Sequence, residues 1–238
     1  MDLTPYTCRG FPGDFDRLMR DVPVAGIDRQ QTHAMIRLCD ETEPILYGAD
    51  FSPRRIRYRA GSRPQLESVV AACNEKAAPT KRTWALGYTR RNVRHPNFAG
   101  VDLPPDRALS EEDLIGSGIG WCNEQCRVYI ALCQVMEIPA RLCYLFHANG
   151  RTGHTACEVF VHDRWEFHDV TFGVGAFREA REIWRDPALR RTMDEIYADV
   201  LPAYYQGKTP PFDLSQGGDF FDAIGICNYL IEGVEAIP

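Results

Sequence analysis

The apolar positions between residues 122 and 138 predict a buried helix near the middle of the chain. Two apolar stripes recur there at helical spacing, and they consist of Cys126, Tyr129, Ile130, Cys133 and Met136 and of Val128, Leu132 and Val135. A helix that is apolar on two faces is typically central and buried. We expect it to end before Pro139, because the residue before a proline disfavours helical backbone angles.

Three apolar runs after this helix predict strands. Residues 142–146 form a continuous apolar run suited to a buried strand, and residues 155–161 and 165–171 follow as two more strands. A tight polar turn near residues 162–164 joins the last two. One helix followed by three antiparallel strands predicts an α+β core.

Further helices are expected on both sides of this core. Ser62-Arg63-Pro64 is a typical helix start, and helical patterns also occur in residues 29–39, 80–92, 109–115, 177–191 and 193–205. We divide the chain into three parts of one compact unit: an N-terminal packing layer of residues 1–62, a core of residues 63–173 and a C-terminal helical extension of residues 174–238.

The composition limits the partners of the protein. The chain has 238 residues and a formal net charge of −6, which gives no general attraction to nucleic acid or to an anionic membrane. The first ten residues lack the basic start and apolar run of a signal peptide, and no apolar stretch approaches the roughly 20 residues that span a bilayer. We therefore expect a cytoplasmic protein with no nucleic-acid or membrane partner.

The nine cysteines make an odd total and lie in apolar stretches, so we expect reduced core residues with one reactive member. A zinc site could be drawn from Cys122, Cys126, His154 and Cys157. However, His154 and Cys157 differ by an odd offset, so in a strand they point to opposite faces, and the chain has no Cys-x-x-Cys pair. We expect no metal and no cofactor.

Cys122 is the candidate for the reactive thiol. It follows Gly120-Trp121 at the predicted start of the central helix, where unpaired N–H groups and about half a unit of positive charge favour thiolate over thiol. In such a setting a cysteine pKa can fall from about 8.5 to about 3.5. An inert core cysteine could occupy the same place, so the assignment also requires a base and a group that orients it.

The hairpin after the helix supplies both groups. With a two-residue loop at His162-Asp163, Ala156 lies opposite Asp169, and His154 lies diagonally from Asp169 on the same face of the sheet. Any loop with an even number of residues keeps the two on one face, whereas an odd loop or a bulge would separate them. His162 is then a turn residue, and His168 faces away from Asp169.

These residues together predict an activated nucleophile. Cys122 would attack, His154 would move protons, and Asp169 would fix the imidazole tautomer. The backbone N–H of Cys122 would point toward the oxyanion. The candidates for a second donor are Trp84, Trp121 and Asn123.

Three more residues near the predicted site have two interpretations each. Trp84 and Trp165 are most simply packing residues, although either could form a wall of the active site. Glu158 shares the face of His154, so it is either a supporting partner of the histidine or a surface carboxylate. Arg141 is expected to satisfy a buried carboxylate or a helix end.

The chain resembles the transglutaminase-like superfamily. The matching motifs, in order and at compatible spacing, are Gly120-x-Cys122, Ile138-Pro139-Ala140-Arg141, His154 with Glu158-Val159, and Trp165 with Asp169-x-Thr171. The match covers residues 118–173, and residues 90–94 resemble the segment that usually precedes it. The sequence departs from the family pattern at Glu137, where a glycine is usual, at Ala156, where an aromatic residue is common, and at Val170, where proline is common.

The resemblance implies a papain/transglutaminase-like core whose nucleophile, base and orienting acid are Cys122, His154 and Asp169. We expect acyl transfer on an amide or peptide bond, with a peptide, a protein or a small amide as substrate. Hydrolysis is favoured over cross-linking, since the sequence has no calcium-loop motif and no extra β-sandwich domains. The alternatives are a non-catalytic binding or scaffold domain and an amide-forming enzyme of small-molecule biosynthesis.

Overall fold

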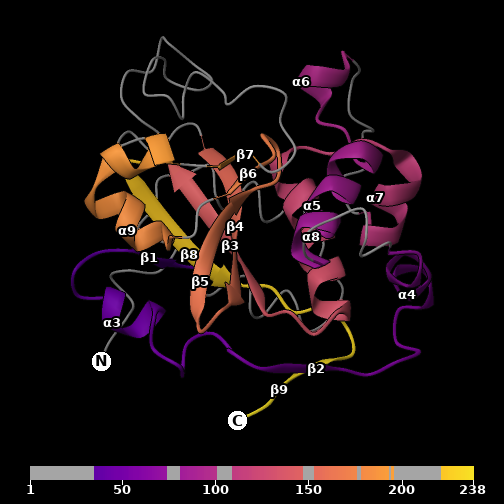
Figure 1. The fold of residues 1–238 in the computed structure, drawn as a ribbon, viewed down its shortest axis with the longest axis horizontal. Helices are drawn as coiled ribbons and strands as arrows, with labels where there is room; N and C mark the ends of the chain where they lie inside the picture. The colour runs from indigo at the N-terminus through magenta and orange to yellow at the C-terminus, as the bar shows by residue number, and fades with distance from the viewer. Residues whose placement is uncertain are drawn as a thin grey trace.

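The chain folds as an antiparallel sheet with helices on both of its faces, which is the predicted α+β class (Figure 1). The computed structural model describes residues 35–73, 81–100, 109–146, 153–175, 178–192, 194–195 and 221–238. The sheet has seven strands in the order β1-β8-β3-β4-β5-β6-β7. Helices α4, α5, α7 and α8 lie to one side of the sheet in Figure 1, and α3 and α9 lie to the other.

Helix α8 (Cys122–Val135) is the predicted central helix, and all but its first and last residues are buried. Its start is capped by Glu124, whose Oε2 accepts the backbone N–H of Trp121 at 3.0 Å. The helix ends before Pro139 as expected, and Glu137 follows with a left-handed φ of 59°. This backbone conformation favours glycine, which is the residue that the family usually has there. Glu137 also accepts the Tyr58 N–H through Oε1 at 3.2 Å.

The three predicted strands are β3 (Ala140–Phe146), β4 (Gly153–Val161) and β5 (Arg164–Asp169), and they pair in antiparallel fashion. His162 and Asp163 form the loop between β4 and β5 with φ values of 52° and 59°, as in a type I′ turn. Val161 pairs with Arg164 and Cys157 with His168, so the predicted two-residue loop and register are confirmed.

We expected a helical C-terminal extension, but one described part of it is a strand of the sheet. Residues Ala223–Asn228 form β8, which pairs with β3 and also with the short strand β1 (Ile36–Arg37). Four successive residues of β8 are buried, and a side chain on Gly225 would collide with Met35. The expected helix at 29–39 is likewise wrong at Ile36–Arg37, and residues 29–34 lie outside the described residues. These strands form through long-range pairing, which a local pattern does not reveal.

The other expected helices are present within a few residues of their predicted bounds. They are α4 (Pro64–Ala71), α5 (Lys81–Asn92) and α7 (Glu111–Ser117). The chain also forms the short helix α6 (Pro96–Ala99). In place of one helix over 177–191, the chain forms α9 (Ala180–Arg185) and a 3-10 helix (Pro187–Thr192). Most of the helix expected at 193–205 lies outside the described residues. The remaining elements are α3 (Glu43–Leu46), β2 (Ile56–Tyr58), β6 (Val174–Gly175), β7 (Asp194–Glu195) and β9 (Val234–Ala236).

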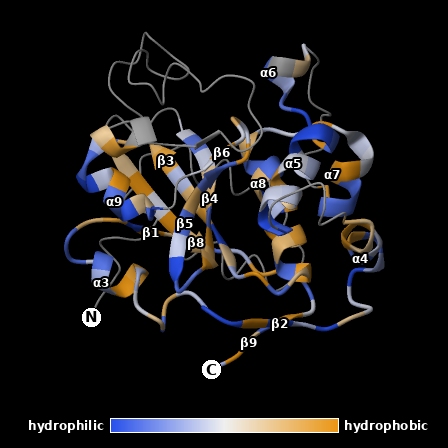
Figure 2. Ribbon diagram, in the orientation of Figure 1, coloured by the Kyte–Doolittle hydropathy of each residue, from blue (hydrophilic) through white to orange (hydrophobic). Residues whose placement is uncertain are grey.

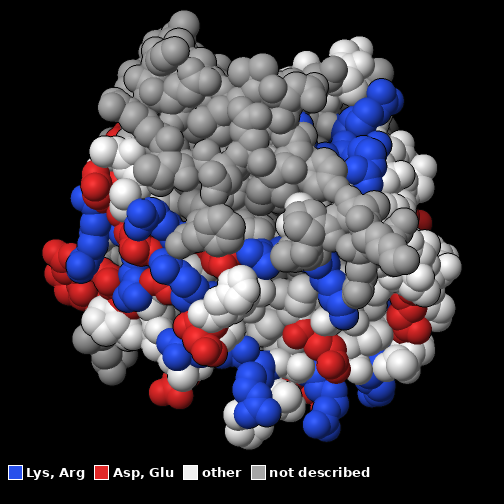
Figure 3. Space-filling view, viewed as in Figure 1, with Lys and Arg blue, Asp and Glu red and all other residues white. Residues whose placement is uncertain are grey.

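Two apolar clusters fill the two sides of the sheet. The larger lies between α8 and the sheet and includes Tyr129 and Leu142, and the smaller includes Leu46 of α3 and Ile183 of α9. Figure 2 shows hydrophobic residues along the central strands and on α9. Acidic and basic side chains are interspersed on the face in Figure 3. Among the described residues, no helix has the length and apolar character of a membrane span.

Candidate active site

Close packing around Gly120 places Cys122 at the start of α8. A side chain on Gly120 would lie 2.7 Å from the Glu124 Cβ and 3.0 Å from a Val93 methyl group, so only glycine fits there. The residues before Cys122 also pair with the segment after α5, since Gly120 N–H donates to the Arg94 carbonyl at 3.1 Å. As a result, Cys122 is the first helical residue, with a half-buried side chain.

His154 and Asp169 are bonded to each other, as the hairpin register predicts. The His154 Nε2 lies 2.7 Å from the Asp169 Oδ2, and both side chains are almost fully buried. His154 is the second residue of β4, whereas the pairing of β4 with β5 begins only at Cys157 and His168. Asp169, the last residue of β5, thus lies beyond the paired part of β4 and β5 and reaches His154 through its side chain.

The turn after β5 holds the Asp169 carboxylate in place. The Asp169 Oδ1 accepts the Phe172 N–H at 3.1 Å, and the Asp169 carbonyl accepts the Gly173 N–H at 2.9 Å. The Thr171 hydroxyl donates to the Gln125 Oε1 at 2.7 Å, which ties this turn to the first part of α8. The bonded His154 and Asp169 and the helix that carries Cys122 are thus connected by hydrogen bonds.

The electrostatics of the site favour a thiolate. Burial by itself would raise the pKa of Cys122, but its hydrogen bond to His154 and the charge of His154 outweigh this effect, and the pKa is lowered. Burial would lower the pKa of His154, but the nearby Asp169 carboxylate raises it well above its ordinary value. Because Nε2 is bonded to Asp169, we infer that Nδ1 faces the sulfur of Cys122.

The other two histidines of the hairpin do not take part in this arrangement. The His168 Nδ1 lies 2.7 Å from the Tyr129 hydroxyl, and its Nε2 lies 3.7 Å from Glu166. Burial lowers the pKa of His168. The His162 side chain is 70% exposed in the turn. Both residues therefore lie where the hairpin register predicted.

The core cysteines differ from Cys122 in their electrostatics. Cys126, Cys133, Cys143 and Cys157 are fully buried, as expected for core residues. Burial raises the pKa of each of these four thiols. Cys122 is the cysteine of α8 whose pKa is lowered, and its hydrogen bond to His154 and the charge of His154 are what set it apart from these four thiols.

The aromatic candidates are not all at the site. Trp121 is the N-cap of α8 and directly precedes Cys122. Trp84 is buried in the core, where its ring stacks on Tyr88 with centroids 5.3 Å apart. Trp165 lies at the opposite end of β5 from Asp169, against the Arg141 guanidinium at 4.1 Å. The interpretation of Trp165 as a site wall is therefore wrong, and packing explains its position.

Asn123 follows Cys122 in the first turn of α8 and is 5% exposed. It remains one of the candidates for a donor to the oxyanion.

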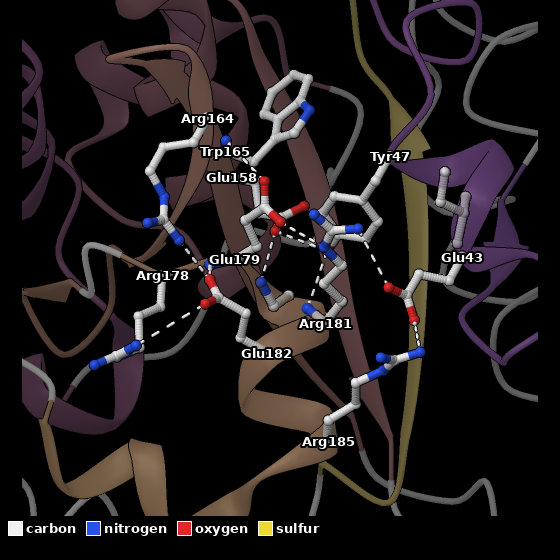
Figure 4. Close-up of polar contacts among 12 residues, drawn as sticks. Glu43, Tyr47, Glu158, Arg164, Trp165, Arg178, Glu179, Arg181, Glu182 and Arg185 are labelled. Carbon is white, nitrogen blue, oxygen red and sulfur yellow. Dashed lines mark hydrogen bonds and ion pairs between the residues drawn. The ribbon is translucent and has the colours of Figure 1, made fainter.

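Glu158 is buried, so its interpretation as a surface carboxylate is wrong. Its Oε2 accepts from the Arg141 guanidinium at 2.8 and 2.9 Å, and its Oε1 accepts from the Tyr47 hydroxyl and the Ala180 N–H. Figure 4 shows Glu158 and Tyr47 together with charged residues of α9. Arg141 satisfies a buried carboxylate, as expected, and it also donates to the Leu46 carbonyl at 2.6 Å.

His95 is a residue near the site that sequence reasoning missed. It is the N-cap of α6, is 4% exposed, and its ring meets that of Trp121 edge to face with centroids 4.9 Å apart. Burial, followed by the charge of His154, lowers the pKa of His95 to about 4, while Asp169 acts in the opposite direction. The one available signal was its position directly after residues 90–94, the segment that usually precedes the motif in the family.

Comparisons with known proteins add little to this geometry. No protein-family model matches the chain, and no curated protein matches it. A solved structure described as a "Putative Cysteine Protease from Cytophaga hutchinsonii" is 19% identical, with a TM-score of 0.34. That match covers 56% of this chain and 43% of the other chain, so this chain spans less than half of its length. The functional assignment therefore depends on the residues of the site.

Proposed function

We propose that the protein is a thiol-dependent acyl-transfer enzyme that acts on an amide or peptide bond. The observation that carries this proposal is the His154–Asp169 contact of 2.7 Å beside a cysteine at a helix start whose pKa is lowered. Nucleophile, base and orienting acid are the parts that acyl transfer by a thiol requires. The arrangement of helix and sheet is proposed to be papain/transglutaminase-like.

In the proposed reaction the Cys122 thiolate attacks the carbonyl carbon, and the electron pair of the C=O bond moves to oxygen. The backbone N–H of Cys122 donates to this oxyanion. When the C=O bond forms again, the amine leaves with the proton of His154 and the acyl group stays on sulfur. Water then attacks the thioester carbon and gives a proton to His154. The C–S bond breaks, its electron pair returns to the Cys122 sulfur as thiolate, and the acid is released. Hydrolysis is proposed over transfer to an amine.

The acyl-enzyme can be trapped with an activated ester such as p-nitrophenyl acetate. We expect a burst of p-nitrophenol and an acetyl group on the peptide that contains Cys122, identified by mass spectrometry. The Cys122→Ala variant should show neither, whereas Cys39→Ala, which removes another half-buried thiol, should behave like the wild type. An intact wild-type protein that forms no adduct would favour the alternative of a non-catalytic binding domain.

Adding an amine to the same assay shows whether the acyl-enzyme reacts with water or with an amine. For a hydrolase, a primary amine at moderate concentration leaves acetate as the main product. Amide formation that replaces acetate would instead assign the enzyme to acyl transfer onto amines.

A further inference from the structure

His95 lies beside the residues that carry the proposed chemistry. The Arg94 N–H donates to the Gly118 carbonyl at 2.9 Å, and the Gly120 N–H donates to the Arg94 carbonyl at 3.1 Å. These two bonds join the segment after α5 to the segment that leads into α8. The Gln125 side chain fixes the same segment by donating to the Val93 carbonyl at 2.7 Å. His95, the next residue along, is thus held at the start of α8.

The His95 ring contacts one residue of the candidate site and lies within electrostatic range of two others. It contacts the ring of Trp121, the residue directly before Cys122. The charges of His154 and Asp169 both act on His95, with His154 the stronger of the two. The imidazole of His95, a residue that is 4% exposed, therefore lies against the N-cap of α8 and within electrostatic range of the bonded pair of His154 and Asp169.

His95 can act as an uncharged hydrogen-bond donor. Its Nδ1 accepts the Asn97 N–H at 3.3 Å, so the proton of the neutral ring is on Nε2. With a pKa of about 4, the ring is neutral at pH 7. A neutral donor does not repel the protonated His154 that is paired with the thiolate, whereas a charged one would.

We propose that His95 is the second donor of the oxyanion hole, where its Nε2–H acts together with the backbone N–H of Cys122. This inference rests on the proposed function and names a catalytic residue for it. When the Cys122 sulfur bonds to the carbonyl carbon and the electron pair moves to oxygen, His95 donates a hydrogen bond to that oxygen and keeps its proton. The bond is lost when the C=O bond forms again.

The alternatives for this donor are weaker in the structure. Trp84 is stacked on Tyr88 in the core, and no described contact joins it to Cys122, His154 or Asp169. Trp121 contacts His95, so its half-exposed ring is suited to hold the imidazole. Asn123 is the competing candidate, because its amide is close in sequence and buried.

Two reactions of the same thiol test the proposal. Acylation by p-nitrophenyl acetate forms an oxyanion, whereas alkylation by iodoacetamide at the Cys122 sulfur does not. In His95→Phe, which keeps an aromatic ring and loses the donor, we expect acylation to fall about 100-fold and alkylation to change by less than about two-fold. His95→Gln retains an N–H donor and should recover part of the acylation rate.

Other outcomes overturn the proposal. Equal loss of acylation and alkylation in His95→Phe would mean that His95 only positions the thiol or His154, and unchanged acylation would remove it from the reaction. A 100-fold loss in Asn123→Ala with none in His95→Phe would assign the donor to Asn123. If His95→Phe does not fold, as judged by its thermal melt, His95→Met takes its place. A wild-type protein that alkylates rapidly but never acylates would overturn the proposed function itself.

Discussion

Strand β4 carries two buried polar clusters on one face, and the two differ in the groups that they connect. At Glu158 both carboxylate oxygens accept two hydrogen bonds each, and the partner Arg141 is sandwiched between the rings of Tyr47 and Trp165. At His154 one ring nitrogen is bonded to Asp169, while the ring also bonds to the half-buried thiol of Cys122.

This difference separates a cluster that stabilises the fold from one that is proposed to take part in the reaction. The Glu158 cluster joins α3, the sheet and the first residue of α9, and both Glu158 and Arg141 are fully buried. A buried ion pair of this kind is destabilising to break, because the remaining charge loses its partner. The His154 cluster instead ends at the thiol of Cys122, a residue that is only partly buried. The same strand therefore supports the fold at one position and is proposed to support the reaction at the other.

The largest expected effect is on catalysis at His154. His154→Ala removes the base, and we expect the acylation rate to fall by as much as about 10⁶-fold, because nucleophile and base act as a unit. The matched control is His162→Asn, which removes the exposed histidine and tolerates its left-handed φ of 52°. Acylation kinetics with p-nitrophenyl acetate measure both, and a comparable loss in the control would contradict the assignment of the base.

Asp169→Asn should reduce acylation by about 10⁴-fold, since the imidazole loses the carboxylate that stabilises its charge. The sign of the pH effect follows from the same contact. Asp169 raises the pKa of His154, so its neutralisation lowers that pKa, and the alkaline limb of the pH–rate profile should move to lower pH. An alkaline limb that stays in place would show that Asp169 does not act on His154.

Glu158→Ala should lower the free energy of unfolding by about 3–5 kcal/mol, because Arg141 remains buried without its carboxylate. Urea denaturation measures this change. Replacing both residues, as in Arg141→Met with Glu158→Leu, should restore much of the lost stability, since no unpaired charge is left. If Glu158→Ala instead left stability unchanged and abolished acylation, the proposed division between the two clusters would be wrong.

The smallest expected effect is at the turn that follows Asp169. Thr171→Val removes the hydroxyl that donates to Gln125 and should cost about 1 kcal/mol of unfolding free energy, with a measurable decrease in acylation. The control is Thr89→Val, whose buried hydroxyl donates within α5 at 2.9 Å. The control should lower stability in urea titrations without changing acylation. A decrease in acylation in both variants would indicate a general loss of stability.

The sequence was sufficient for the parts of the fold that are local. The period of apolar residues predicts α8, and the two-residue loop at His162-Asp163 fixes the register that puts His154 and Asp169 on one face. The place of β8 beside β3 was not predictable in this way, since its partner lies far away in the chain. His95 was missed for the same reason, because its contact with Trp121 depends on how α5 packs against α8.

The most direct test of the central claim is the pH dependence of Cys122 alkylation by iodoacetamide, followed by mass spectrometry of the peptide that contains Cys122. With His154 present, we predict an apparent pKa below the ordinary thiol value of about 8.5. In His154→Ala the midpoint should move upward. A wild-type midpoint at or above about 8.5, unchanged in His154→Ala, would contradict the claim that His154 activates this thiol.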